Sequence, residues 1–402
     1  MNMYPTPLLL AGYLLLALTP GCKKGGGAGS QPMPSVSVSN ISLPEGNGGA
    51  TNFQFTLKLS RASAQAVTIS YSTLEGTAKN GDDFTAVNNQ SVTLQPNETE
   101  KAVTIAVVAD DARESDETFT LMLTGAANAT IQQQTAEATI VNDDTRIPFT
   151  NAGYDAPTSY AGYTLAWADE FNAGSLDAAA WTNQNGDGCP GICGWGNNEL
   201  DYYTGRPENI FFQDGKLIIE ARKENFGGRS YTSSKILTQG KKTFKFGRFD
   251  IRAKLPKGKG IWPAFWMLPQ SNVFGGWPTS GEIDIMEVVG HEPSKTHGTI
   301  HYGPGPGSLQ VSRNTTLAAG TLNDEFHVYS LEWKQDQLKW YLDGVLFSTV
   351  NKSELVASAT YPFNETFFFI VNLAVGGNWP GNPDATTVFP QWLIVDYIRV
   401  YQ

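Results

Sequence analysis

Residues 281–290 read Gly-Glu-Ile-Asp-Ile-Met-Glu-Val-Val-Gly, and the rest of the chain is organised around this stretch. Its apolar, β-prone residues predict a strand, although three carboxylates interrupt them within six positions. In a regular strand Glu282 and Asp284 share a face, whereas Glu287 points the other way, into apolar packing. A lone carboxylate is costly to bury there. One extra residue at positions 285–286, a β-bulge, returns Glu287 to the face of the other two.

A row of carboxylates on one face of a sheet suits the cleavage of a glycosidic bond. One acid must donate a proton to the leaving oxygen, while a second, ionised carboxylate attacks the anomeric carbon. Retention of configuration needs the two groups about 5–5.5 Å apart, which same-face positions of a bulged strand can supply. Asp284 between them would hydrogen-bond Glu282, and its charge would keep a proton on the acid. An acidic strand edge and a calcium site are the alternative interpretations.

This motif is similar to the active-site signature of family 16 of the glycoside hydrolases, in the bulged form that laminarinases carry. The likeness covers about residues 160–402 and includes residues 195–200 (Trp-Gly-Asn-Asn-Glu-Leu), 246–249 (Phe-Gly-Arg-Phe), 254–256 (Lys-Leu-Pro), 261–268 (Ile-Trp-Pro-Ala-Phe-Trp-Met-Leu) and 376–380 (Gly-Gly-Asn-Trp-Pro). The resemblance implies that Glu282 is the nucleophile and Glu287 the acid/base, with Asp284 orienting the nucleophile. No cofactor is implied for catalysis.

The same resemblance implies a retaining endo-glycosidase that cleaves β-1,3-linked glucan of the laminarin type. Two alternatives stay open. Within the family, the substrate could be a mixed-linkage glucan or another polysaccharide. In another class, the chain could be a glucan-binding protein without catalysis, but such proteins typically replace one Glu of the motif, and here all three carboxylates are intact.

The composition and charge of the chain limit the kinds of molecule that it can bind. The chain has 402 residues, enough for two or three domains that each bury a core. A net charge of −11 argues against nucleic acid and other anionic polymers, and is compatible with a neutral polysaccharide. All ten Trp lie at or beyond Trp167, which indicates two chemically different regions. We expect a monomer.

The N-terminus reads as a targeting segment. Residues 8–18 form an apolar run too short to cross a bilayer as a permanent helix. The run ends in Leu-Thr-Pro-Gly-Cys, which resembles a bacterial lipoprotein cleavage box with Cys22 as the lipidated residue. We therefore predict a signal peptide over residues 1–22, a flexible tether over 23–34, and an outer-membrane or cell-surface lipoprotein. Simple secretion without a lipid is the alternative. If the protein is a lipoprotein, the lipid on Cys22 is its only contact with the membrane.

Residues 35–144 alternate short apolar strands with turns rich in Gly, Asn and Asp, which predicts an immunoglobulin-like β-sandwich. The region resembles a Calx-beta domain, on residues 44–46, 81–84, 110–119 and 142–144. Its acidic loop residues could supply oxygen ligands to calcium, although ordinary turn chemistry explains them as well. Residues 145–162 contain two prolines and no clear strand, and are predicted as the interdomain linker.

Residues 163–402 contain many alternating segments and an Asp343-Gly344 hairpin signal, which predict a large antiparallel sandwich. Family membership would make it a jelly roll with a concave cleft. Cys189 and Cys193 predict a local disulfide that braces the loop before Trp195, because a metal site or a redox centre would need other spacings or ligands.

Sugar rings have apolar faces that stack on flat aromatics, while polar side chains read their hydroxyls. The aromatic candidates for the cleft are Trp195, Trp262, Trp266, Trp277 and Trp379, each with core packing as its alternative. By the resemblance, Asn197 and Arg252 contact sugar hydroxyls, and His301 on a neighbouring strand contacts the substrate or the acid/base.

Two further predictions come from the resemblance. Glu170, Asp396 and the backbone of Gly215 match the place where many members hold a structural calcium, with surface carboxylates as the alternative. Asp201 stands where laminarinases often have Gln. If Asp201 faced the cleft, it would add a negative charge at a distal subsite.

Overall fold

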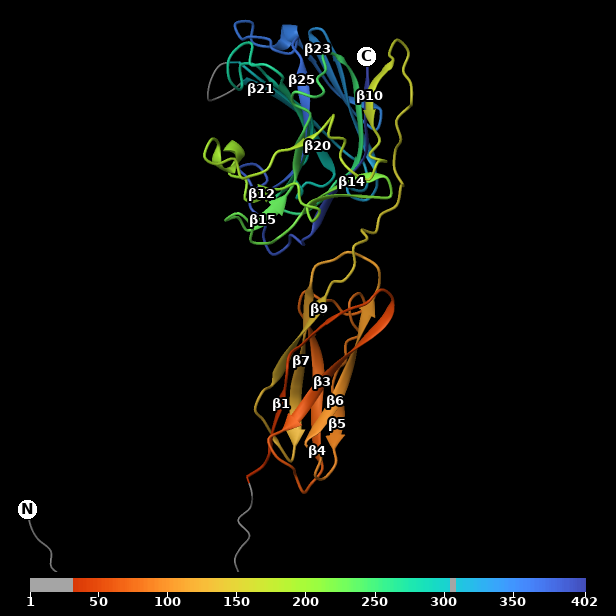
Figure 1. Cartoon of the computed structure of the whole chain (residues 1–402), viewed down its shortest axis with the longest axis vertical. Helices are drawn as coiled ribbons and strands as arrows, with labels where there is room; N and C mark the ends of the chain where they lie inside the picture. The colour runs from red at the N-terminus through yellow and green to blue at the C-terminus, as the bar shows by residue number, and fades with distance from the viewer. Residues whose placement is uncertain (1–31, 304–308) are drawn as a thin grey trace, which may run out of the picture.

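The computed structural model describes residues 32–303 and 309–402 and is built almost entirely of strands. Within these ranges the helical segments are two 3₁₀ turns, Cys193–Gly196 and Lys352–Glu354, and no helix has the length and apolarity needed to cross a bilayer. The strands form two bodies stacked end to end (Figure 1). The all-β class is thus confirmed, while the predicted signal peptide with Cys22 lies outside the described residues.

The N-terminal body is a sandwich of two sheets. One sheet has the order β6 (Glu100–Ala109), β3 (Gly49–Leu59), β1 (Ser35–Val38), β8 (Thr130–Ile131), and the other β2 (Ile41–Pro44), β9 (Thr135–Val141), β7 (Glu117–Ala127), β4 (Val67–Glu75), β5 (Gln90–Leu94). Phe53, Phe55 and Leu57 alternate into its core because successive side chains of β3 point to opposite faces.

The C-terminal body is a larger sandwich. Its outer sheet has the order β13 (Ile210–Gln213), β14 (Lys216–Ala221), β26 (Gln391–Tyr401), β17 (Gly247–Lys254), β22 (His327–Lys334), β23 (Gln337–Leu342), β24 (Val345–Asn351), with β10 (Leu165–Asp169) also paired to β26. The inner sheet has the order β11 (Thr182–Asn183), β16 (Lys235–Leu237), β25 (Phe367–Val375), β18 (Ile261–Pro269), β19 (Glu282–Glu287), β20 (Lys295–Tyr302), β21 (Leu309–Thr316). A small parallel pair joins β12 (Asp201–Tyr203) to β15 (Tyr231–Ser233).

Alternation in the inner sheet separates the core from the cleft. Phe265 and Met267 of β18 enter the core between the two sheets, whereas Trp262 and Trp266 of the same strand are partly exposed on the other face. The inner sheet therefore supplies the surface on which a site can be built.

The predicted linker, residues 145–162, lies against the outer sheet rather than hanging free. Ile147 is buried in an apolar cluster with Ile218 of that sheet. Further along, the backbone N–H of Ala156 donates to the Tyr397 hydroxyl at 3.0 Å. The segment lacks a strand, as predicted, but it is a strap that runs up the side of the C-terminal body (Figure 1).

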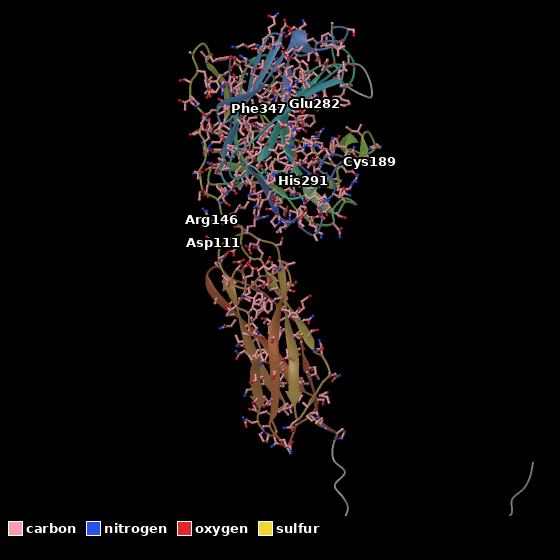
Figure 2. All side chains as sticks on the ribbon, turned by 180° about the vertical axis from the view of Figure 1, so that it is seen from behind. Asp111, Arg146, Cys189, Glu282, His291 and Phe347 are labelled. Carbon is pink, nitrogen blue, oxygen red and sulfur yellow. A yellow bond between two sulfur atoms is a disulfide. The ribbon has the colours of Figure 1, made fainter. Side chains whose placement is uncertain are left out.

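The two bodies are joined by a buried ion pair. Arg113 of the N-terminal body makes two contacts to Glu220 of β14, Nε to Oε2 at 2.7 Å and Nη2 to Oε1 at 3.1 Å. Glu220 is fully buried, and the Arg113 guanidinium also lies 4.9 Å from the centre of the Phe211 ring. Arg146 pairs with Asp214 beside this contact, at the junction seen in Figure 2. A bidentate Arg–carboxylate pair fixes orientation as well as distance.

Replacing Arg113 with Ala should uncouple the two bodies. Glu220 keeps Arg222 and Trp392 as partners but loses its link across the junction. We expect the free energy of unfolding to fall by about 1–3 kcal/mol, and protease to cut residues 145–162 faster. Lys58→Ala, which removes an exposed pair with Glu100, is the control and should change little. Identical calorimetric and proteolytic behaviour of the two variants would contradict a structural junction.

Candidate active site

Strand β19 contains the predicted bulge. Against β20, Asp284 pairs with Thr299 and Glu287 pairs with His297, so three steps on β19 face two steps on β20. The same shift appears against β18. The extra residue brings Glu287 to the face that already carries Asp284 and Glu282, as predicted from the sequence.

The bulge is held from the core side. Ile285 and Met286 are consecutive, yet both are buried between the sheets, so the extra residue is apolar. The indole Nε1 of Trp340, from the outer sheet, donates to the backbone carbonyl of Asp284 at 2.9 Å. A Cβ at Gly298 on β20 would lie only 2.3 Å from the Trp340 ring, so this position needs Gly to admit the indole. Packing between the sheets therefore sets the direction of the acidic row.

Glu282 stands among three polar groups at the start of β19. The indole Nε1 of Trp277 donates to its Oε2 at 2.9 Å. The ring Nε2 of His301 lies 3.7 Å from Glu282 Oε1 and 3.4 Å from Asp284 Oδ2. The Glu282 side chain is 16% exposed, so it is accessible to solvent. Figure 2 labels it within the C-terminal body. Sequence reasoning had placed both Trp277 and His301 here.

Glu287 ends the acidic row in an aromatic setting. The indole Nε1 of Trp262 donates to its Oε1 at 3.2 Å. Trp379 packs edge-on against Trp262, with ring centres 5.7 Å apart, and against His297 at 5.0 Å. His297 was given no role from the sequence. Its position four residues before His301 on one strand was the available signal, because such residues share a face.

The surroundings of Glu282 and Glu287 affect the pKa values of the two carboxyls differently. Burial, and then the charge of Asp284, raises the pKa of Glu282 to about 8, while His301, Trp277 and Lys235 act in the opposite direction. Burial and the charges of Asp284 and Glu282 raise the pKa of Glu287 well above its ordinary value. Glu282 has more groups that stabilise its charged form, so it is the first of the two glutamates to ionise as pH rises, whereas Glu287 keeps its proton. Environments that treat two carboxyls differently assign acid and base roles.

The far side of the cleft holds the other candidates. Trp195 lies in the 3₁₀ turn and is half-buried, and Trp266 donates from Nε1 to Asn372 Oδ1 at 2.7 Å. Lys235 lies between the two indoles. Asn197 is exposed, its amide 3.5 Å from Glu199. Sequence reasoning missed Lys235 and Asn372, whose position here depends on strands β16 and β25 pairing side by side.

Comparison with known proteins supplies the family. The model of glycosyl hydrolases family 16 matches residues 197–392, and that of the Calx-beta domain matches residues 32–144. The chain is 42% identical over 262 residues to the beta-glucanase of Rhodothermus marinus, covering 62% of this chain and 89% of that protein. The chain belongs to glycosyl hydrolase family 16.

Two further similarities agree with that assignment. Glucan endo-1,3-beta-glucosidase A1 of Niallia circulans is 41% identical over 272 residues, which are 62% of this family-16 chain and 39% of that longer protein. The laminarinase catalytic domain of Thermotoga maritima MSB8 has a similar structure, with 46% identity and a TM-score of 0.56, over 60% of this chain and 98% of that one.

The family-16 body contains the predicted disulfide. Cys189 and Cys193 are bonded to one another in the loop that leads into the 3₁₀ turn of Trp195 (Figure 2 labels Cys189). The loop is also tied by Asp187, which forms an ion pair with Arg229 at 3.0 Å. The disulfide thus braces the segment that carries one side of the cleft.

Arg252 does not contact the cleft, and its prediction as a substrate-binding residue is wrong. It lies on β17 of the outer sheet and is 5% exposed. Its guanidinium donates to Asp396 Oδ2 at 2.6 Å and to the backbone carbonyl of Tyr154 at 2.7 Å. Arg252 therefore holds the strap of residues 145–162 against the outer sheet.

The carboxylates of the calcium site predicted at Glu170, Gly215 and Asp396 form ion pairs in this structure, and calcium there stays a prediction. Asp396 accepts from Lys216 at 2.8 Å as well as from Arg252. Glu170 forms a bidentate pair with Arg399, at 2.7 and 2.8 Å. Because both oxygens of each carboxylate contact a cation, a calcium ion beside Gly215 would have to displace these ion pairs.

Asp201 is fully buried on β12 and does not line a subsite. Neither of its carboxylate oxygens has a hydrogen-bond partner among the residues that the structure describes. Burial, and then the neighbouring Glu199, raises its pKa well above the ordinary value. Burial therefore favours the neutral form of Asp201, and the side chain does not reach the cleft.

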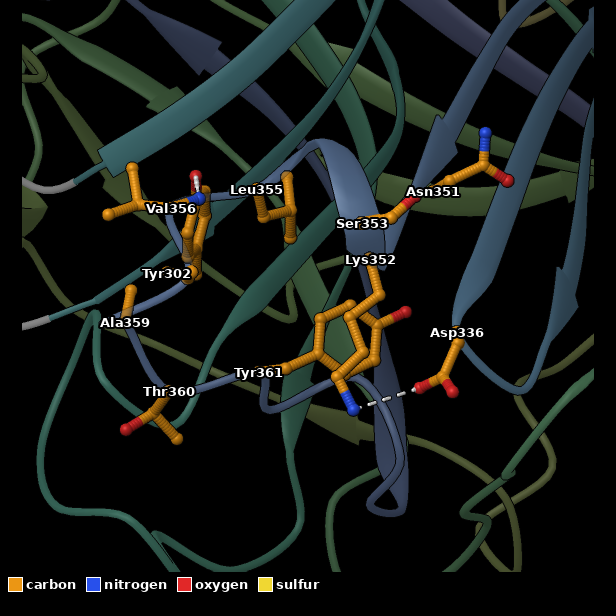
Figure 3. A pocket seen from close by; sticks show the side chains of 11 residues that line it. Tyr302, Asp336, Asn351, Lys352, Ser353, Leu355, Val356, Ala359, Thr360 and Tyr361 are labelled. Carbon is orange, nitrogen blue, oxygen red and sulfur yellow. Dashed lines mark hydrogen bonds and ion pairs between the residues drawn. The ribbon is translucent and has the colours of Figure 1, made fainter.

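The C-terminal body has two cavities, of which the smaller lies beside the start of the acidic row. One of about 240 Å³ extends the cleft past Trp277 and is lined by Gln239, Gln270 and Phe368. The other, of about 560 Å³, is lined by Tyr302 and Tyr361 and by the Lys352–Asp336 ion pair (Figure 3). Tyr302 follows His301 directly, so it points to the opposite face of β20. The larger cavity contains none of the three carboxylates.

Glu282→Gln should stabilise the protein, and more so at high pH. An unfolded Glu ionises near pH 4.5, whereas the folded pKa is raised to about 8. Between these values the folded state holds a proton that the unfolded state releases, so the wild type loses stability as pH rises through this window. We expect Tm to rise by about 2–4 °C at pH 9, and hardly at all at pH 4.

The matched control is Glu100→Gln, which changes an exposed carboxylate on β6 that pairs with Lys58. This control variant should show no increase in Tm that grows with pH. Calorimetry at the two pH values checks the prediction, and an equal gain from Glu282→Gln at both would contradict the raised pKa.

Proposed function

We propose that this chain is a retaining, endo-acting β-1,3-glucanase, with mixed-linkage β-1,3-1,4-glucan as its alternative substrate. The observation that carries the proposal is the bulged strand β19, which directs Glu282 and Glu287 to one aromatic-lined face. The names of the similar proteins, a laminarinase and an endo-1,3-beta-glucosidase among them, support the substrate.

The geometry suits a double displacement. Ionised Glu282 attacks the anomeric carbon and forms a glycosyl-enzyme, while Glu287 protonates the departing oxygen. Glu287 then takes a proton from water, and the hydroxyl adds to the anomeric carbon as the bond to Glu282 breaks. The Trp277 indole and His301 stabilise the Glu282 carboxylate between the two steps.

Asp284 acts as a positioning residue. It is 2% exposed, on the same face of β19 as Glu282, and His301 lies close to both. Its burial raises its pKa to about 8, so it shares a proton with its neighbours rather than carrying a full charge. The hydrogen bond that joins the Asp284 and Glu282 carboxyls can therefore orient Glu282.

The cleft surface suits a neutral sugar chain. Trp277 is 56% exposed and Trp379 is 41% exposed, at opposite ends of the acidic row. Large exposed indoles stack on the apolar faces of sugars, and single-residue core packing does not explain them. The acidic row would repel sulfated or carboxylated polymers.

Glu282→Ala and Glu287→Ala should separate the two roles. On laminarin, loss of the general acid should lower kcat by about 10²–10⁴-fold, and loss of the nucleophile at least as much. On an aryl β-laminarioside, whose phenol leaves without protonation, Glu287→Ala should keep far more activity than Glu282→Ala. Glu292→Ala, a nearby carboxylate paired with Lys295, is the control and should remain active. Equal recovery of both variants on the aryl substrate would overturn the assignment.

Substrate and stereochemistry are tested together. Wild-type protein is incubated with laminarin, lichenan, agarose and carrageenan, and reducing ends are measured. We expect release from laminarin to be fastest and the first product, by proton NMR, to be the β-anomer. Preference for lichenan would favour the mixed-linkage alternative, and initial release of the α-anomer would contradict retention.

We further propose that the Calx-beta domain binds calcium. Two groups of carboxylates have oxygens within 4.8 Å of one another, Glu45 with Asp143 and Asp144, and Asp83 with Glu114 and Glu117. One oxygen each of Asp144 and Glu117 is buried without a hydrogen-bond partner among the described residues. Burial, and then the neighbouring acids, raises the pKa of Glu45 to about 7. Hard oxygen ligands in this arrangement suit calcium.

Calcium should stabilise the Calx-beta domain selectively. At a concentration 100 times Kd the gain is about 2.7 kcal/mol, so the unfolding transition of this domain should move up with calcium and down with chelator. Asp144→Asn should lose the shift, and Glu137→Gln, an exposed acid on β9, should keep it. Calorimetry that shows no calcium-dependent shift in the wild type, at millimolar calcium, would overturn the site.

We also propose that the protein is exported as a lipoprotein through Cys22, and that it works as a monomer. The support is the sequence at the end of the apolar run, which lies outside the described residues. Cys22→Ser should abolish incorporation of labelled fatty acid and move the protein from the detergent phase to the aqueous phase. Unchanged partitioning of that variant would favour simple secretion.

A further inference from the structure

Lys235 is a buried cation on the far side of the cleft. It is 6% exposed, and its Nζ lies 4.2 Å from the centre of the Trp195 ring and 5.2 Å from that of Trp266. A third ring, that of Tyr203, is 5.6 Å away. Cation–π contacts stabilise an ammonium in such a place but leave its three N–H donors unsatisfied.

The ammonium has no acceptor of its own. Among the described residues, no hydrogen bond or ion pair is made by the Lys235 ammonium, and its Nζ is not sealed from solvent. A buried, unpaired ammonium is costly, so it indicates a missing partner. Because the ammonium lies against the rings of Trp195 and Trp266, and Trp266 is partly exposed on the cleft face of β18, a partner in the cleft can reach it.

The acids behind Lys235 do not serve as that partner. Glu199 accepts a hydrogen bond from the Tyr203 hydroxyl at 2.7 Å, and Tyr203 accepts in turn from Asn372 at 3.2 Å. Burial raises the pKa of both Glu199 and Asp201. Neither carboxylate forms an ion pair with the ammonium, so neither satisfies its N–H donors.

Lys235 belongs to the same row of side chains as Glu287. In the sheet register Lys235 pairs with Asn372, Asn372 with Ala264, and Ala264 with Glu287. Directly paired residues point to the same face, so all four lie on the cleft side. Three strand spacings of about 4.8 Å place the Lys235 backbone about 14 Å from that of Glu287, which is more than one sugar unit from the cleavage point.

We propose that the Lys235 ammonium donates hydrogen bonds to the hydroxyl or ring oxygens of a glucosyl unit at the Trp195–Trp266 side of the cleft. Lys235 is thus a substrate-binding residue far from the cleavage point, and it favours the binding of long glucan chains over short ones. The inference rests on the proposed glucanase function. Neutral sugars suit the site, because their oxygens can accept hydrogen bonds from the ammonium without bringing a charge close to the buried acids.

The test compares kcat and KM on laminarioligosaccharides of three to seven units for the wild type and Lys235→Met. Methionine fills the space between the indoles but removes charge and donors. We expect KM for the longest oligosaccharides to rise about 10- to 100-fold, with kcat changed less than about threefold. The effect should shrink for the trisaccharide, which is too short to reach Lys235. A rise in KM with little change in kcat is expected when a contact made equally in the ground state and in the transition state is lost.

Lys235→Arg keeps a charged donor and should retain most of the chain-length preference. Lys339→Met on β23 of the outer sheet, where the lysine pairs opposite Glu332, is the control and should behave as wild type. Should Lys235→Met not fold, Lys235→Gln keeps a neutral donor in the same place, and an intermediate rise in KM is expected of it.

The outcomes separate this inference from the proposed function. A wild-type protein that cleaves no β-1,3-glucan would overturn both. A wild type that cleaves laminarin, with a KM that Lys235→Met or Lys235→Gln leaves unchanged at every chain length, would overturn the role of Lys235 alone. An equal loss at all lengths would also overturn it, because a purely structural role predicts no dependence on chain length.

Discussion

The acidic row depends on one local constraint, the extra residue that separates Asp284 from Glu287. Because Ile285 and Met286 both enter the core, β19 cannot slip by one position without burying a carboxylate or exposing an apolar side chain. Trp340, from the opposite sheet, fixes the distorted backbone from behind. The chemistry of the cleft is thus anchored in the packing between the two sheets.

Crowding three carboxylates on one buried face lowers stability, and it is also what makes the site reactive. The groups that offset this cost are unevenly distributed. Glu282 has Trp277 and His301 beside it and Lys235 further away, whereas Glu287 has an indole N–H and more distant help from His301. Such an arrangement keeps one carboxyl ready to attack and the other protonated, although both belong to one short strand.

The outer sheet has a structural role, which explains why Arg252 was wrongly predicted to bind substrate. Arg252 and Asp396 are charged and paired with one another, but they face away from the cleft, and Arg252 holds residues 145–162 in place. Arg113 and Glu220 close the junction at the start of that strap. The Calx-beta domain is therefore attached through specific contacts, and the catalytic body does not swing freely on a linker.

The sequence by itself determined what depends on near neighbours: the alternating strands, the two-body organisation, and the bulge within residues 281–290. These follow from side-chain period and from the cost of burying charge, which act over a few residues. Only the tertiary structure decided the partners of Arg252, Lys235 and His297. Their roles depend on strands brought together from far apart, as with Arg252 and Asp396, which are 144 positions apart. A local pattern records the face of a strand, but not which distant strand lies beside it.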